Sequence, residues 1–297
     1  MTVIECHDVT KSYRSQIILD QLNFTIKENT LTGIIGRNGV GKTTLMKMIA
    51  GFIQEDSGNL SVFSERPFNS LKVSSNSIFI DDLMSFPQSM TLNDILKECE
   101  RFYFRWDHTL ALRLLEYFEL HPNIKPRVLS KGKRSTFNAI IGLASRSPLT
   151  IFDEPTTGMD AVVRKDFYRA LLKDYLAHPR TILLSSHHVE EIEHLLEDVL
   201  LIHNKKVLFH DSITALQESF LHVTGKEQLI LKHIQRQDAI ASKDTGPYVI
   251  WTVKNQLSDE TLNAMRKDHI RISPVSANEA YVTLTQQSKG GIDHVFE

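Results

Sequence analysis

Residues 36–43 have the types and spacing of a loop that binds phosphate. They match the pattern G-x-x-x-x-G-K-[ST]. The glycines let the backbone wrap closely, so that its N–H groups converge on phosphate oxygens, and the following helix points its positive N-terminus at the same anion. The lysine can reach the β- and γ-phosphates, and the threonine can hold Mg²⁺. The predicted nucleotide-binding residues here are Gly36, Arg37, Asn38, Gly39, Val40, Gly41, Lys42, Thr43 and Thr44.

Two adjacent acids, Asp153 and Glu154, can supply the remaining chemistry of phosphate transfer. They follow the apolar run Leu-Thr-Ile-Phe, which predicts a buried strand that ends at Asp153. Asp153 can hold Mg²⁺ through water together with Thr43, and Glu154 can orient or deprotonate the attacking water. Such a group typically contributes about 10²–10⁴-fold in rate. An isolated Asp-Glu pair is more often a solvated strand end, but the loop at 36–43 favours the metal and water site.

Apolar and amphipathic segments alternate along the chain and predict the elements that hold these residues. Strands alternating with helices indicate a mainly parallel α/β sheet. The first 35 residues are strand-like and predict an antiparallel β subdomain. Two adjacent helices and a third after them predict a helical insertion at about residues 85–145, with Thr91, Thr109 and Ser130 as helix caps. Buried strands are expected in LTGIIG, NSIFI, LTIFD, TILLSS and DVLLI, and a sixth strand in KKVLFH.

The composition changes after about residue 222, which predicts a first domain at 1–221 and a second at 222–297. In the second domain, residues 227–233, 248–253 and 280–286 are predicted as strands, and SDETLNAMRKD as a capped helix. This predicts a small α+β appendage. The last ten residues, which include Gly290 and Gly291, are expected to be mobile.

Composition and charge exclude several classes of protein. The chain has 34 basic and 36 acidic residues, a net charge of −2, so no nucleic-acid partner is indicated. The longest stretch without a charged residue is about 11 residues, whereas a membrane-spanning helix needs about 20 apolar residues. Glu5 and Asp8 argue against a signal peptide. Two cysteines, Cys6 and Cys99, are typical of reduced cytosolic thiols.

Residues 1–220 resemble the ATP-binding cassette of ABC transporters, a P-loop NTPase fold. LSKGKRS resembles the family's LSGGQ signature, TTGMD its D-loop, and SSHH its switch-histidine segment. The resemblance implies that Ser130 and Gly132 bind the γ-phosphate held by an opposite cassette, and that Asp160 is the D-loop acid. It also implies His187 as the switch histidine, with His188 as the alternative. Tyr13 stands where the family stacks an aromatic ring on adenine, a contact worth about 1–3 kcal/mol.

Two motifs depart from the family's pattern. The signature has Lys131 and Lys133 where the commonest form has Gly and Gln, and LSKG is similar to cassettes of ABC-2 type exporters, including bacitracin and lantibiotic exporters. The Q-loop position carries Asp82 instead of Gln, and Gln88 lies too far along the chain to replace it. Because Asp is shorter and charged, Asp82 is expected to contact nucleotide-bound Mg²⁺ through a water.

The resemblance implies an ATPase that binds ATP and Mg²⁺ and drives export through a separate integral membrane permease, with antimicrobial or amphipathic peptides as the leading candidate cargo. A second cassette, identical or related, completes the site, and the expected location is the cytoplasmic face of the cell membrane. The alternative is a soluble ABC ATPase of DNA repair or translation. A GTPase or kinase is less consistent, because NKKV at Asn204 lacks the Asp of the guanine-reading pattern.

Overall fold

The chain folds into two compact units, Met1–His210 and Asp211–Glu297. The computed structural model describes residues 1–187 and 189–285. The division precedes the boundary expected at residue 222. His188 and the tail that contains Gly290 and Gly291 lie outside the described residues.

A six-stranded sheet forms the centre of the first unit, and all six expected strands are found in it. Its order is β5-β6-β7-β3-β8-β9, with parallel pairing from β5 to β8. Because parallel strands end at one edge, Ile35, Ile80, Asp153 and Ser186 all lead into loops at that edge. The strands are β3 (Leu31–Ile35), β5 (Ser77–Ile80), β6 (Leu149–Asp153), β7 (Thr181–Ser186), β8 (Asp198–His203) and β9 (Lys206–Ser212).

An antiparallel three-stranded sheet, in the order β2-β1-β4, forms the expected β subdomain. Buried and exposed residues alternate along much of its longer strands, as expected for a sheet with one face packed. Its apolar face shares a core with α1 (Lys42–Ile49), which follows the loop at 36–41. The strands are β1 (Thr2–Tyr13), β2 (Gln16–Lys27) and β4 (Ser57–Val62).

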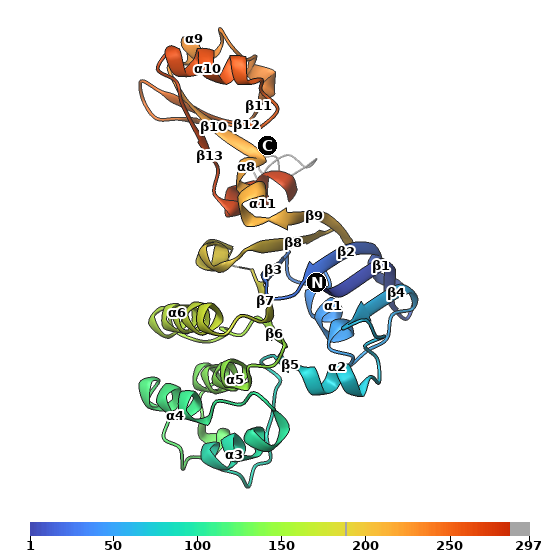
Figure 1. Cartoon of the computed structure of the whole chain (residues 1–297). Coiled ribbons are helices and arrows are strands. Elements are labelled where there is room, and N and C mark those ends of the chain that lie inside the picture. The colour runs from blue at the N-terminus through green and yellow to red at the C-terminus, as the bar shows by residue number, and fades with distance from the viewer. Residues whose placement is uncertain (188, 286–297) are drawn as a thin grey trace. The chain divides into compact units, whose positions relative to one another are not determined.

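Helices cover both faces of the six-stranded sheet, with α5 and α6 on one side and α1 on the other (Figure 1). The helical insertion contains α3, α4 and α5. Thr91 and Ser130 cap α3 and α5 as expected, but Asp107 rather than Thr109 caps α4, because its carboxylate accepts the Leu110 N–H. The bounds are α1 (Lys42–Ile49), α2 (Leu71–Asn76), α3 (Leu92–Phe102), α4 (His108–Tyr117), α5 (Lys131–Ser145), α6 (Ala161–Ala177) and α7 (Val189–Ile192), with single 3₁₀ turns at Pro126–Val128 and Glu193–Leu195.

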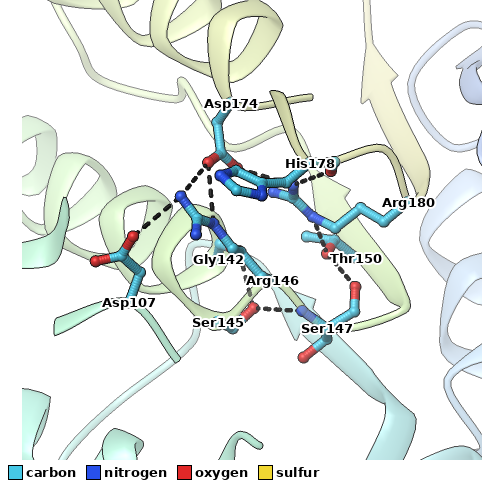
Figure 2. A network of polar contacts seen from close by, with 9 residues as sticks. All are labelled: Asp107, Gly142, Ser145, Arg146, Ser147, Thr150, Asp174, His178 and Arg180. Carbon is cyan, nitrogen blue, oxygen red and sulfur yellow. Dashed lines mark hydrogen bonds and ion pairs between the residues drawn. The ribbon is translucent and has the colours of Figure 1, made fainter. Parts of the chain in front are cut away.

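A network of ion pairs ties the insertion to the helices on the sheet (Figure 2). Arg146, which ends α5, contacts Asp107 at the start of α4 and Asp174 on α6, both at 3.0 Å. Arg180 donates to Asp174 at 2.8 Å and to Thr150 at 3.2 Å. Asp174 therefore joins two arginines that come from different elements, and Arg180 is only 2% exposed.

The second unit contains an antiparallel four-stranded sheet in the order β11-β12-β10-β13. Its core surrounds Trp251 and includes Val223, Ile230 and Met265. No helix in the described part of the chain is long and apolar enough to span a bilayer. The elements are α8 (Ile213–Glu218), β10 (Phe220–Gly225), α9 (Glu227–Ile230), a 3₁₀ turn (Arg236–Asp238), β11 (Ala239–Asp244), β12 (Val249–Lys254), α10 (Asp259–Lys267), β13 (Arg271–Pro274) and α11 (Ala277–Thr285).

Two of the three strands predicted in this unit are wrong. Residues 227–233 form α9 and a turn. Ile230 and the Ile234 that follows the turn are buried at helical spacing rather than at alternate positions. Residues 280–285 belong to α11. There Ser276 and Glu279 cap each other's backbone N–H groups, which favours a helix over the β-propensity of the sequence.

Candidate nucleotide-binding site

The loop between β3 and α1 has the backbone geometry of an anion cradle. Gly41, the N-cap of α1, has φ 106°, a conformation that favours glycine. A Cβ there would also lie 2.6 Å from Leu19 Cδ2, so no other residue fits without movement. Gly41 has no side chain to cap the helix, which leaves the first N–H groups of α1 free of a side-chain partner. The loop therefore offers N–H donors and the helix dipole to an anion.

Lys42 is fixed in the loop by its own backbone. Its side chain is only 5% exposed, and Nζ donates to the Gly36 carbonyl at 2.8 Å and to the Arg37 carbonyl at 3.4 Å. Glu154 Oε1 lies 3.5 Å from the same Nζ. The ammonium is thus preorganised beside the cradle, with one carboxylate as its counter-charge.

Thr43 and Asp153 meet as the sequence predicts. Thr43 Oγ1 donates to Asp153 Oδ2 at 2.6 Å, and Ser185 Oγ donates to Asp153 Oδ1 at 2.7 Å. Sequence analysis did not identify Ser185, although it pairs with Asp153 in the β6–β7 register. A hydroxyl and a carboxylate are the hard oxygen donors that Mg²⁺ prefers, so this pair fits that ion.

Glu154 is held in an unusual conformation between Lys42 and His187. Its φ is 47°, the left-handed region, which costs a non-glycine residue about 1–3 kcal/mol. Its N–H donates to Ser185 Oγ at 2.8 Å, and His187 Nδ1 lies 3.4 Å from its Oε2. The side chain therefore contacts Lys42 on one oxygen and His187 on the other.

A pocket of about 400 Å³ lies over this loop. Tyr13 ends β1 and lines this pocket, and the residue is 48% exposed, which leaves its side chain accessible to a stacked base. Lys11 Nζ lies 5.7 Å from the ring centroid. Arg37 and Val40 do not line the pocket, and neither does Gly36, where a Cβ would collide with the Ile202 carbonyl. The lining residues are Tyr13, Ile18, Asn38, Gly39, Gly41, Lys42, Thr43, Thr44 and Glu154.

The signature and D-loop residues lie together but outside this pocket. Ser130 caps α5 by accepting the Lys133 N–H, and Asp160 caps α6 by accepting the N–H groups of Val162 and Val163. A Cβ at Gly132 would collide with the carbonyl oxygen of Gly158. The start of α5 thus rests directly on the loop before α6. Ser130, Gly132 and Asp160 do not line the pocket over the phosphate loop of their own chain.

The two acids after β5 have different surroundings. Asp82 is 41% exposed, and its Oδ2 lies 3.4 Å from Lys131 Nζ. Asp81 is 15% exposed and follows Ile80, which pairs with Phe152, so it lies beside Asp153. Burial raises the pKa of Asp81 and the charge of Asp153 raises it further, whereas Lys47 lowers it. Sequence analysis missed Asp81. The rule that parallel strands end at the same edge of a sheet can identify it, because Asp81 directly follows β5.

Comparison with known proteins agrees with this geometry. The pattern that defines the ABC transporter family matches residues 19–157. The bacitracin transport ATP-binding protein BcrA of Bacillus licheniformis is 32% identical over 210 residues, 70% of this chain and 69% of that protein. The ABC transporter ATP-binding protein YtrB of Bacillus subtilis is 26% identical over 284 residues, 96% of both chains. The zinc uptake protein ZurA of Listeria monocytogenes is 29% identical over 267 residues, 82% of this chain and 98% of that protein.

Solved structures share the fold. The ATP-binding subunit of an ABC transporter superposes with a TM-score of 0.65 at 23% identity, over 73% of this chain and 92% of that one. A dimeric cassette bound to ADP and phosphate gives 0.62 at 20% identity, over 71% and 98%. With the phosphate loop and the acids of β6 in place, the chain belongs to the family of ABC transporter ATP-binding cassettes. The full-length match to YtrB also covers the second unit.

Proposed function

We propose that this chain binds and hydrolyses ATP as the nucleotide-binding subunit of an ABC exporter. The observation that carries the proposal is the meeting of Lys42, Thr43, Asp153 and Glu154 at one edge of the sheet. Lys42 and the N–H groups of the loop bind the β- and γ-phosphates, and Tyr13 stacks on adenine. Asn38, Gly39 and Thr44, which also line the pocket, contribute to the same site.

Mg²⁺, held by Thr43 and through water by Asp153, would neutralise charge on the phosphates. Glu154 orients the attacking water and accepts its proton, because its carboxylate is fixed next to the phosphate loop. His187, 3.4 Å from Glu154, holds that carboxylate in position. The role of Asp82 as a water-mediated metal contact stays a prediction, since the carboxylate lies beside Lys131.

A second cassette is needed to complete the site. Ser130 and Gly132 lie outside the pocket of their own chain, at the N-terminus of α5, where they can bind the γ-phosphate of an opposite cassette. Asp160, at the N-terminus of the adjacent α6, faces the same partner. The dimeric structure of a cassette with the same fold supports this arrangement.

A separate integral membrane permease carries the substrate, and the chain works at the cytoplasmic face of the membrane. The names of BcrA, for bacitracin transport, and ZurA, for zinc uptake, show that similar cassettes serve different cargoes. The signature LSKG and the match to BcrA favour export, with antimicrobial or amphipathic peptides as the proposed cargo. The family match and the name of BcrA favour transport over DNA repair or translation.

Two variants test the site. Lys42→Ala should abolish ATP binding or turnover with the fold intact, because it removes the cation held at the centre of the loop. Glu154→Gln should retain ATP binding, nearly stop hydrolysis and accumulate an ATP-bound dimer, measured by sedimentation. Near-normal hydrolysis by either variant would contradict the assignment of that residue.

A further inference from the structure

Two of the residues that depart from the family's pattern are in contact with each other. Asp82 replaces the Gln of the Q-loop and Lys131 replaces a Gly of the signature, and Asp82 Oδ2 lies 3.4 Å from Lys131 Nζ. Lys131 is the first residue of α5, directly after Ser130. The pair therefore joins the loop after β5 to the helix end that the proposed function assigns to a partner's γ-phosphate.

The ion pair lies at the surface and can open without releasing the loop. The side chains are 41% and 64% exposed. The Lys131 stem lies along Gly158, with Cγ 3.3 Å from the position of a Cβ on that glycine, so its direction is set by packing. The loop is held to α5 independently, because the buried Asn138 donates to the Asp81 carbonyl at 3.2 Å.

We propose that Asp82 and Lys131 form a latch that is closed in the single cassette and opens when two cassettes pair around ATP. This rests on the proposed function, in which the start of α5 meets the partner's triphosphate. A triphosphate carries more negative charge than one carboxylate. When the cassettes pair, Lys131 therefore leaves the Asp82 carboxylate and binds the partner's phosphate instead. Lys131 is thus a further phosphate-binding residue, and Asp82 competes with the nucleotide for it.

The size of the effect follows from the exposure of the pair. Exposed ion pairs change an equilibrium constant by a factor of about 1.4–5, and a symmetric dimer opens two. Removing the competition should therefore strengthen pairing by about 2- to 30-fold. Asp82→Asn has nearly the same shape as the wild type and removes only the charge.

The test measures ATP-driven dimerisation of the Glu154→Gln chain by sedimentation with ATP and Mg²⁺. Asp82→Asn should strengthen pairing, and Lys131→Ala should weaken it. In the Lys131→Ala background, Asp82→Asn should have no effect. Lys133→Ala is the matched control: it removes a signature lysine that has no ion pair among the described residues. In that background, the gain from Asp82→Asn should persist.

The outcomes separate the latch from the function on which it depends. An equal gain from Asp82→Asn in the presence and absence of Lys131 would overturn the latch, because the gain would then come from the charge near the nucleotide. No gain in a chain that does dimerise with ATP overturns the latch alone. A Glu154→Gln chain that binds ATP but never pairs overturns the composite site and the latch with it.

Discussion

Asp174→Asn should strongly destabilise the first unit, because Asp174 is the acid that joins Arg146 and Arg180. The substitution keeps the shape of the side chain but removes its charge. Arg180 would then be a buried cation, 2% exposed, whose Nη2 already has no hydrogen-bond partner among residues 1–187 and 189–285. Burial lowers the pKa of Arg180, and Asp174 is the group that opposes this. Breaking such a buried pair costs about 3–5 kcal/mol.

For a unit of this size, each kcal/mol corresponds to about 2–4 °C, so the melting temperature should fall by ~6–20 °C. Trp106 lies in the first unit and Trp251 in the second. In a Trp251→Phe background, Trp106 fluorescence therefore reports unfolding of the first unit alone.

The control is Asp166→Asn, the same substitution on α6. Asp166 pairs with Arg169, which is 65% exposed, and an exposed pair is worth about 0–1 kcal/mol. Asp166 also accepts a hydrogen bond from the exposed Tyr117 hydroxyl at 2.8 Å, which the amide oxygen of Asn can still accept. If Asp174→Asn melts within 2–4 °C of this control, the network does not hold the insertion and the helices together as the distances indicate.

Three further predictions concern the site and the buried acids and thiols. Gly41→Ala should abolish nucleotide binding in a fluorescent-ATP titration, whereas Gly39→Ala, where a Cβ meets nothing within 4 Å, should weaken it less. Asp81→Asn should raise the free energy of unfolding at pH 7. The pKa of Asp81 is raised in the folded chain, so ionising this carboxyl costs stability as the pH rises above its ordinary pKa of 3.8. Urea titrations should show the gain at pH 7 and none at pH 3. Burial raises the pKa of Cys6 and Cys99 to about 12, so both should resist alkylation at pH 8 until the chain unfolds, as mass spectrometry would show.

The site could be predicted from the sequence where a motif is continuous, as at 36–43, and where it follows a buried strand, as at Asp153. Ser185 and Asp81 were missed because they reach the site through strand register, which no local pattern contains. The position of Asp82 in the loop after β5 predicts a place near the metal. The sequence does not show that Lys131, distant along the chain, lies beside Asp82 in the fold.

The second unit shows where β-propensity misleads. Tyr281, Val282 and Thr283 favour a strand, yet Ser276 and Glu279 form a capping box that begins α11. That signal was present in the sequence and outweighs propensity, because it pairs N–H groups that a helix start leaves without partners. The α9 segment gave no such signal, and its single turn depends on burial of Ile230 in the core around Trp251.

The contact between Gly132 and Gly158 also explains which signature positions this sequence can change. Gly132 lies against a backbone carbonyl, so any side chain there would push apart the starts of two helices. Lys131 and Lys133 are exposed on either side of it, where a long side chain displaces nothing. Substitutions at positions 131 and 133 can therefore alter the charge that this surface presents to a partner, each independently, without moving the backbone that carries them.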